Sequence, residues 1–198
     1  MKMNRREFFK RSTLAATALQ LRLAHASGEA ADPVDAIDPI IGASTSTALG
    51  EGKTFPGVTA PFGMVQLSPD TITGGDNASG YSYEHTTIEG FSFTHMSGVG
   101  WFGDFGNLLV MPSVGELKTV CGRPSHPREG WRSGFGHASE VAECGYYAVT
   151  LDKHGIRAEL TAAEYAGMLR FSFPRTQSAR VQIDLARRIG GTPGSTCA

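Results

Sequence analysis

Short apolar runs, several of them alternating with polar residues, dominate the chain beyond residue 35. The alternation is clearest in residues 90–94 (GFSFT) and 169–173 (LRFSF), where aromatic side chains take one face and polar ones the other. Residues 152–155 (DKHG) separate two such runs and predict a hairpin turn, in which Gly155 is free to take a positive φ. The predicted strands are residues 63–67, 90–95, 108–111, 146–151, 156–160, 169–173 and 180–185.

No convincing helical pattern accompanies these strands, and the chain holds 25 glycines and 10 prolines. Many short strands with frequent turn residues predict an all-β, antiparallel β-sandwich rather than alternating strands and helices. Long glycine-rich loops are expected at residues 42–56, 69–81, 97–107 and 121–145. Loops of this length usually form functional surfaces or flexible segments. No closing element follows residue 185, so we expect the sandwich to be incomplete at its C-terminus, as in a fragment.

The first 26 residues have the composition of an export signal. Residues 4–10 (NRREFFK) carry paired arginines, two aromatics and a lysine, which is typical of a twin-arginine signal. Residues 12–23 are mildly apolar but are too short and too polar to span a bilayer. Ala24 and Ala26 provide the small residues of a cleavage site after Ala26. The predicted organisation is therefore a signal at 1–26, a linker at 27–36 and one domain at 37–198.

Removal of the signal changes the charge of the chain. It leaves 18 − 6 = 12 basic and 19 − 1 = 18 acidic residues, a net charge of −6. This acidic balance argues against a nucleic-acid partner and suits a periplasmic or secreted protein acting on neutral substrates. Cys121 and Cys144 fit either a disulfide across a loop or two small buried side chains, and Cys197 lies next to the end.

The densest group of chemically useful residues is 94–104 (THMSGVGWFGD). Trp101 could stack on the C–H face of a sugar while Asp104 binds its hydroxyls. The alternative is that Trp101 fills the core and His95 is a buried, hydrogen-bonded histidine. A transition-metal site from His85, His95 and Asp104 with Glu84 lacks any recognised ligand spacing.

Hydrolytic chemistry is weakly supported by the residues alone. The chain has no G-x-S-x-G nucleophile turn and no Lys-Ser/Thr phosphate loop. Glycoside hydrolysis needs two carboxylates on either side of the bond, and the sequence does not pair Asp70, Asp76, Glu84 or Asp104.

Residues 52–70 (GKTFPGVTAPFGMVQLSPD) strongly resemble the opening signature of glycoside hydrolase family 92. The similarity begins at 37–42 (IDPIIG) and continues in order and spacing through most of the predicted domain. Its further stretches are residues 79–83 (SGYSY), 87–92 (TIEGFS), 94–100 (THMSGVG), 108–112 (LLVMP), 145–151 (GYYAVTL) and 158–164 (AELTAAE).

This resemblance implies a calcium-dependent, inverting exo-α-mannosidase that acts on mannose-containing glycans. It implies a galactose-mutarotase-like supersandwich before an (α/α) barrel that holds the catalytic residues and most of the calcium site. No catalytic residue or metal ligand is therefore expected within this chain. By position in the family, Gly42, Ala43 and Trp101 are the residues expected to bind substrate, and Asp104 joins them because it shares a loop with Trp101.

Two other functions stay open at this stage. The first is a stand-alone carbohydrate-binding module that uses Trp101 for stacking. The second is a truncation product without function.

Overall fold

A computed structural model describes residues 32–46, 48, 52–71, 79–98 and 105–189. The predicted signal peptide and cleavage site lie outside these residues. The chain separates into one unit that ends at Ala36 and a second that starts at Ile37. In the first unit the structure describes a short 3₁₀ helix, η1 (Pro33–Ala36), within the predicted linker. No helix among the described residues is long and apolar enough to cross a bilayer.

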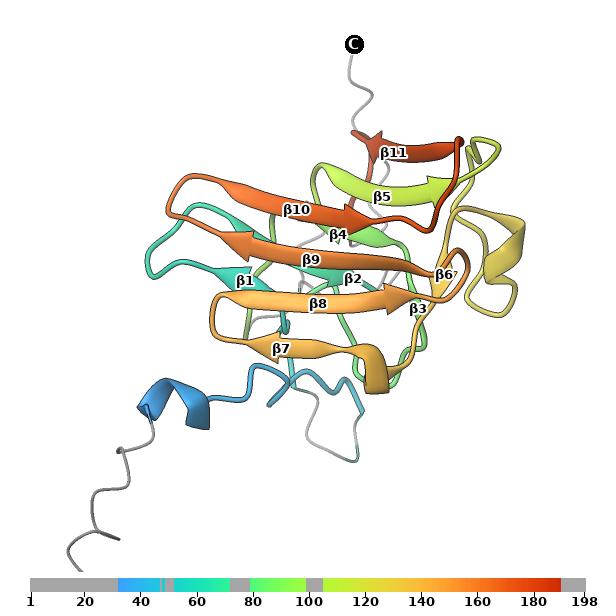
Figure 1. Cartoon of the computed structure of the whole chain (residues 1–198). Coiled ribbons are helices and arrows are strands. Elements are labelled where there is room, and N and C mark those ends of the chain that lie inside the picture. Colours follow the sequence, from blue (N-terminus) through green and yellow to red (C-terminus); the bar gives the residue numbers. More distant parts are fainter. Residues whose placement is uncertain (1–31, 47, 49–51, 72–78, 99–104, 190–198) are drawn as a thin grey trace, which may run out of the picture. The chain divides into compact units, whose positions relative to one another are not determined.

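The second unit contains two larger antiparallel sheets (Figure 1). The first has the strand order β1-β2-β4-β5-β11. Its strands are β1 (Val58–Thr59), β2 (Gln66–Asp70), β4 (Gly90–Ser92), β5 (Leu109–Val114) and β11 (Ala179–Asp184). The last pair joins distant parts of the chain, because Ala179 lies opposite Val114 and Asp184 opposite Leu109.

The second sheet is a meander in the order β10-β9-β8-β7. It consists of β7 (Val141–Glu143), β8 (Tyr146–Leu151), β9 (Ile156–Ala162) and β10 (Gly167–Ser172). The predicted turn at 152–155 joins β8 to β9, and Gly155 has a φ of 63°. A two-stranded ladder pairs β3 (Thr87–Ile88) with β6 (Ser133–Gly134), and two 3₁₀ helices, η3 (Pro127–Glu129) and η4 (His137–Ser139), lie in the same part of the chain.

The two sheets pack face to face around one apolar core. Strand β9 shows the alternation that this packing requires, since Ile156, Ala158 and Leu160 are buried while the residues between them are less so. Phe91 on β4 and Phe171 on β10 join the layers, with their ring centroids 6.0 Å apart. The prediction of an all-β, antiparallel sandwich is confirmed.

The alternating runs predicted the longer strands well. Strand β8 has its predicted bounds, and β9, β10 and β11 differ from theirs by one or two residues. Strand β2 begins at Gln66 rather than at residue 63. The loop predicted for 121–145 was wrong, because β6, β7, η3 and η4 all fall within it. These pieces are two or three residues long, which is too short to show a period in the sequence.

The sandwich also has an exposed apolar edge strand and, among the described residues, two free cysteines. Strand β11 exposes Val181, Ile183 and the following Leu185 at 52%, 60% and 55% of their surface. Cys121 and Cys144 are free thiols, so the disulfide alternative does not apply to this structure. Burial raises the pKa of the Cys121 thiol to about 11.

Candidate functional site

The segment that opens the domain turns sharply at Gly42, one of the predicted sugar-binding residues. Gly42 has a φ of 82°, which glycine adopts without strain. Gly52 packs against it so closely that a Cβ there would lie 2.2 Å from the carbonyl oxygen of Gly42. The amide of Thr54 donates to the same oxygen over 3.1 Å. Two loop segments are thereby fixed backbone to backbone, with Gly42 exposed.

The loop that carries Trp101 starts from the same place. The amide of Gly98 donates to the carbonyl oxygen of Lys53 over 2.6 Å, next to the contact between Gly42 and Gly52. At the other end of this loop, the amides of Gly106 and Asn107 donate to the hydroxyl of Thr94. Trp101 and Asp104 themselves lie outside the described residues. The structure therefore brings the base of their loop to Gly42.

Ala43 lies beside Gly42 but is completely buried. Its amide donates to the carbonyl oxygen of Ile40, and its own carbonyl oxygen accepts from the amide of Tyr83. Both backbone groups and the methyl group are therefore used within the fold. Ala43 fixes the position of the Gly42 turn rather than offering a surface of its own.

A carboxylate with three hydroxyl groups stands next to this turn. Glu84 accepts hydrogen bonds from the Ser44 hydroxyl, from the Thr45 amide over 3.2 Å and from the Ser82 hydroxyl over 2.7 Å. The hydroxyls of Thr45 and Ser82 lie 2.5 Å apart. The hydrogen bond from Ser44, followed by that from Ser82, lowers the pKa of Glu84 to about 2. Glu84 is exposed while Ser82 is fully buried, so this array presents an ionised acid to solvent and holds it from below.

Thr71 connects this array to a second loop. Its hydroxyl accepts from the Ser82 amide over 2.8 Å, and its own amide donates to the carbonyl oxygen of Gly80 over 2.8 Å. Nδ1 of His85 lies 3.1 Å from the Thr71 carbonyl oxygen. Thr71 and Gly80 flank residues 72–78, so the ends of that loop are also held at the site.

A buried histidine lies beneath the loop bases. His95 is 2% exposed, and its Nδ1 lies 2.6 Å from the carbonyl oxygen of Gln66, to which it donates. Its Nε2 lies 2.8 Å from Oδ1 of Asp70. The residue thus ties the start of the Trp101 loop to strand β2, which agrees with the structural alternative considered for His95.

The segment 79–85 is anchored on its inner side by a second acid. Glu140 accepts from the hydroxyl groups of Tyr81 and Tyr147 over 2.9 Å and 2.6 Å. His137 places Nδ1 2.7 Å from Glu140 and stacks on the ring of Tyr83, with the centroids 4.1 Å apart. Burial, with the charge of Glu140 as the next cause, raises the pKa of both Tyr81 and Tyr147.

The described residues do not form a metal site. No three His, Cys, Asp or Glu side chains among them converge on one point. His85 and His95 make the hydrogen bonds given above, and Asp70 is fully buried against His95. We therefore assign no metal ligand among the described residues.

This arrangement can bind rather than react. An exposed acid, neighbouring hydroxyls and an exposed glycine turn match the polar groups that hold sugar hydroxyls.

Residues 36–196 match the family described as the glycosyl hydrolase family 92 N-terminal domain. The chain belongs to glycoside hydrolase family 92. The resemblance stated from the sequence is thereby confirmed.

Solved structures of the same family share the fold. A family 92 α-mannosidase from Bacteroides thetaiotaomicron is 40% identical, with a TM-score of 0.74 over 79% of this chain and 20% of that one. The same enzyme is known in complex with mannoimidazole. A family 92 inverting mannosidase from the same organism is 30% identical, with a TM-score of 0.65 over 80% of this chain and 20% of that one.

One curated protein is also similar to this chain. An uncharacterized secreted glycosidase from Arthroderma benhamiae is 31% identical over 142 residues, which cover 72% of this chain and 17% of that protein. The chain thus spans about a fifth of the length of the relatives that it matches.

Sequence reasoning missed most of the residues that surround Gly42 and Glu84 in the structure. Ser44 and Thr45 reach Glu84 from 40 and 39 positions away, and no period in the sequence links them. Glu140 lies in a region predicted to be a loop, and it contacts Tyr81 from 59 positions away. Only the motif 79–83 (SGYSY), already marked by its resemblance to the family, indicated that this segment matters.

Proposed function

We propose that this chain is the N-terminal segment of an exported, calcium-dependent, inverting exo-α-mannosidase that acts on mannose-containing glycans. In this proposal it contributes loops to the mannose pocket, and the catalytic groups belong to a longer protein. Export follows the twin-arginine route to the periplasm or the medium. The observation that carries the proposal is the convergence of three loop bases, at Gly42, Thr71 and Gly98, in a member of family 92.

Several facts support the proposal. The relatives named above include an α-mannosidase, an inverting mannosidase and a secreted glycosidase. A sugar-shaped ligand, mannoimidazole, is bound by one of them. Glu84 and Ser44 supply the polar groups, and Trp101 with Asp104 would complete the pocket from the loop that begins at Gly98.

Binding and turnover test the two halves of the proposal separately. Mannoimidazole added to the purified ¹⁵N-labelled chain is expected to shift the amide signals of Gly42 and Gly98 and the indole signal of Trp101. Gly115, in the turn that follows β5, is the internal control. If millimolar mannoimidazole shifts none of the signals of Gly42, Gly98 and Trp101, the proposal that this chain contributes loops to the mannose pocket is wrong.

The activity assay uses α-mannobiose with calcium and with a chelator. We expect no turnover in either condition, because in this proposal the catalytic groups belong to another part of a longer protein. Calcium-dependent turnover by this chain would place the catalytic carboxylates within it and contradict the assignment of catalysis to another segment.

A further inference from the structure

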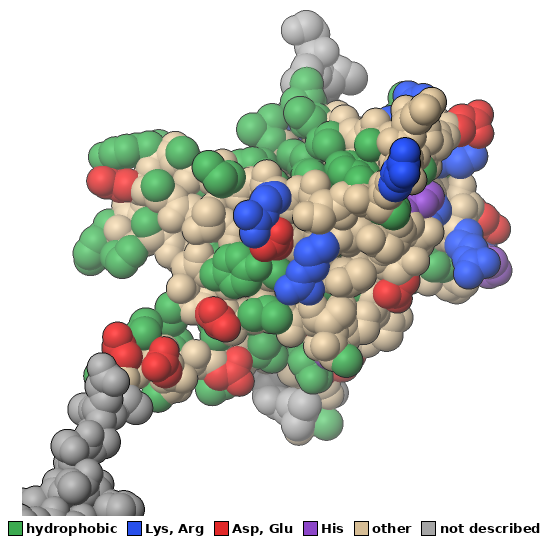
Figure 2. Space-filling view, in the orientation of Figure 1, with side chains coloured by type: hydrophobic (Ala, Val, Ile, Leu, Met, Phe, Trp, Pro, Cys, Tyr) green, Lys and Arg blue, Asp and Glu red, His purple; other side chains and the backbone are tan. Residues whose placement is uncertain are grey.

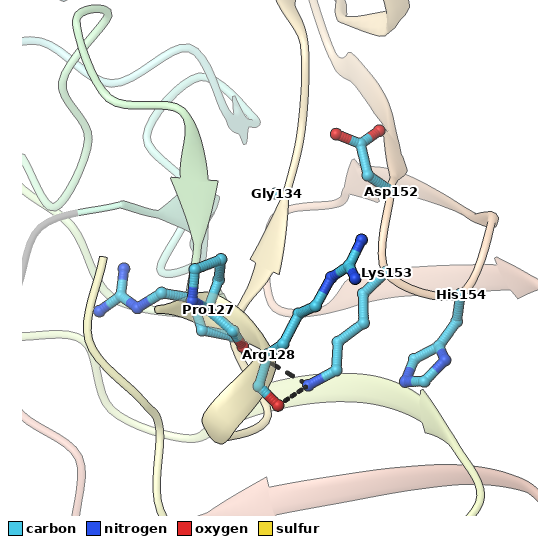
Figure 3. Close-up of a pocket in the computed structure, with 7 residues that line it drawn as sticks. Pro127, Arg128, Gly134, Asp152, Lys153 and His154 are labelled. Carbon is cyan, nitrogen blue, oxygen red and sulfur yellow. Dashed lines mark hydrogen bonds between the residues drawn. The ribbon is translucent and has the colours of Figure 1, made fainter. Parts of the chain in front are cut away.

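A basic pocket lies away from the Gly42 and Glu84 site, between η3 and the turn that joins β8 to β9 (Figure 3). The main cavity has a volume of about 630 Å³ and is lined by Arg128, Lys153 and His154, by Arg132, which is paired with Glu89, and by one acid, Asp152. Arg128, Lys153 and His154 also line a smaller cavity of about 100 Å³ that reaches Trp131. None of these residues belongs to the Gly42 and Glu84 site.

The basic side chains are not equivalent. Nζ of Lys153 donates to the backbone carbonyl oxygens of Pro127, Arg128 and Gly130, so its hydrogen-bonding capacity is used within the protein. Arg128 and His154 make no side-chain hydrogen bond or ion pair within the part of the chain that the structure describes. Figure 3 shows Lys153 and His154 extending from the β8–β9 turn over the segment that carries Arg128.

These cations repel one another. Burial lowers the pKa of Lys153, and the charges of Lys118 and Arg128 lower it further. Burial and the charge of Lys153 lower the pKa of His154. Figure 2 shows basic and histidine side chains, with acidic ones beside them, at the end of the sandwich that carries β6. Because the predicted mature chain is acidic overall, this local excess of positive charge is a specific feature of the pocket.

The smaller cavity adds an aromatic wall and two buried polar atoms. The indole N–H of Trp131 donates to the carbonyl oxygen of Glu89 over 3.0 Å, so what Trp131 offers to the cavity is its ring. Ser113 and Gln182 line the same cavity, and within the part of the chain that the structure describes, Oγ of Ser113 and Oε1 of Gln182 are buried without a hydrogen-bond partner. Ser113 is only 7% exposed. Buried polar atoms of this kind need a partner, and a ligand hydroxyl supplies one.

We propose that the basic pocket binds an acidic sugar, that is, a sugar unit carrying a carboxylate or a phosphate group. Arg128 and His154 bind the acidic group, the Trp131 ring packs on the sugar, and Ser113 and Gln182 hydrogen-bond its hydroxyls. An aromatic ring beside unpartnered polar atoms fits a sugar better than a bare anion. Arg128 and His154 favour an acidic sugar over a neutral one, because their charges are not paired within the described residues.

Titration calorimetry on the purified chain tests this assignment with glucuronic acid, glucose 6-phosphate, glucose and inorganic phosphate. We expect at least one of the two acidic sugars to bind about tenfold or more tightly than both glucose and inorganic phosphate. Phosphate binding as tightly as the acidic sugars would mean a simple anion site and overturn the proposal. Equal binding of glucose, or no binding of either acidic sugar, would overturn it as well.

Two variants locate the binding. Arg128→Gln is expected to weaken the acidic sugar about tenfold, since it removes a charge-assisted hydrogen bond worth ~1.4 kcal/mol. Arg123→Gln, in the same segment but paired with Glu129 outside the pocket, is the matched control and should bind as the wild type does. In a Trp101→Phe background, Trp131 is the sole tryptophan of the chain, and its fluorescence should change on binding. Unchanged fluorescence, or equal loss in both arginine variants, would place the ligand elsewhere.

Discussion

Glu89 and Arg187 form an ion pair within the fold although they lie 98 positions apart in the sequence. The second oxygen of Glu89 pairs with Arg132, so one carboxylate joins the segment after β11 to the start of β6. The side chains of Glu89 and Arg132 are 1% exposed and that of Arg187 is 11% exposed. Burial raises the pKa of Glu89, and the two arginines oppose that effect.

Glu89→Ala is expected to lower the free energy of unfolding by about 3–5 kcal/mol, because it leaves buried arginine charge without its acid. Urea denaturation measures the change. Glu129→Ala removes an acid of the same type from an exposed pair with Arg123 and should cost at most ~1 kcal/mol. Similar losses of unfolding free energy in the two variants would show that the buried ion pairs of Glu89 stabilise the fold no more than an exposed pair does.

Glu84 gives the site a dependence on acid pH. The pKa of Glu84 is lowered to about 2 in the fold, so its hydrogen bonds stabilise the folded state fully above the ordinary value of 4.5. This contribution is lost as the pH falls from about 4.5 to about 2. The stability difference between wild type and Glu84→Gln should therefore be constant above pH 5 and shrink below it. Because Glu84 is exposed, solvent screening makes the difference small.

Urea midpoints measured from pH 2 to pH 7 follow this change. Glu164→Gln, an exposed acid in a turn, is the control and should show no such convergence. A difference for Glu84→Gln that grows towards pH 2 has the opposite sign and would contradict the assignment.

Tyr81 and Tyr147 predict a limit on stability at alkaline pH. Their pKa values are raised in the fold, so they stay neutral there while the unfolded chain ionises above about pH 10. Stability that is present below pH 10 is then lost as the pH rises, at about 1.4 kcal/mol per pH unit for each tyrosine. Tyr81→Phe should reduce the slope of stability against pH by the contribution of one tyrosine, about 1.4 kcal/mol per pH unit.

Absorbance at 295 nm gives an independent measurement, since ionisation of both buried tyrosines should coincide with unfolding. Tyr165→Phe, at a residue 72% exposed, should leave the slope unchanged. Ionisation of Tyr147 in the folded chain would contradict its burial against Glu140.

Gly52→Ala tests whether close backbone packing shapes the Gly42 turn. The new Cβ would lie 2.2 Å from the Gly42 carbonyl oxygen, so the two segments must separate. We expect a loss of about 1–3 kcal/mol in stability and faster amide exchange at Thr54 and Gly98. Gly136→Ala, where a Cβ meets no atom within 4 Å, should change neither quantity. Unaltered exchange at Thr54 in Gly52→Ala would show that the contact does not hold the turn.

The sequence predicted those parts of the fold whose pattern extends over several residues. Strand β8 was located within its bounds, because six residues precede a recognisable turn and follow Gly145. Strands β1, β3 and β6 have two residues each, and β3 and β6 depend on pairing between distant positions, such as Gly134 opposite Thr87. Tertiary contacts decide such strands, and local preference does not.

The candidate site was likewise predicted only in part, because some of its residues are marked locally in the sequence and others are brought together only by the fold. Gly42 was marked by its resemblance to the family, and the structure gives it an exposed, left-handed turn. Ala43, selected with it, is buried. Glu84 was considered as a metal ligand and instead accepts hydrogen bonds from Ser44 and Ser82. Those partners come from separate segments, so only the folded chain brings them together.

The pairing of β5 with β11 sets an order in which the chain can fold. Residues 141–172 pair only with sequence neighbours and can form their meander as soon as they have left the ribosome. The five-stranded sheet is completed last, because β11 reaches Leu109–Val114 only after residue 184 has been synthesised. Until then β5 has one open edge, although its other edge can already pair with β4. The final strand of the chain thus closes a sheet whose other four strands were synthesised before the meander.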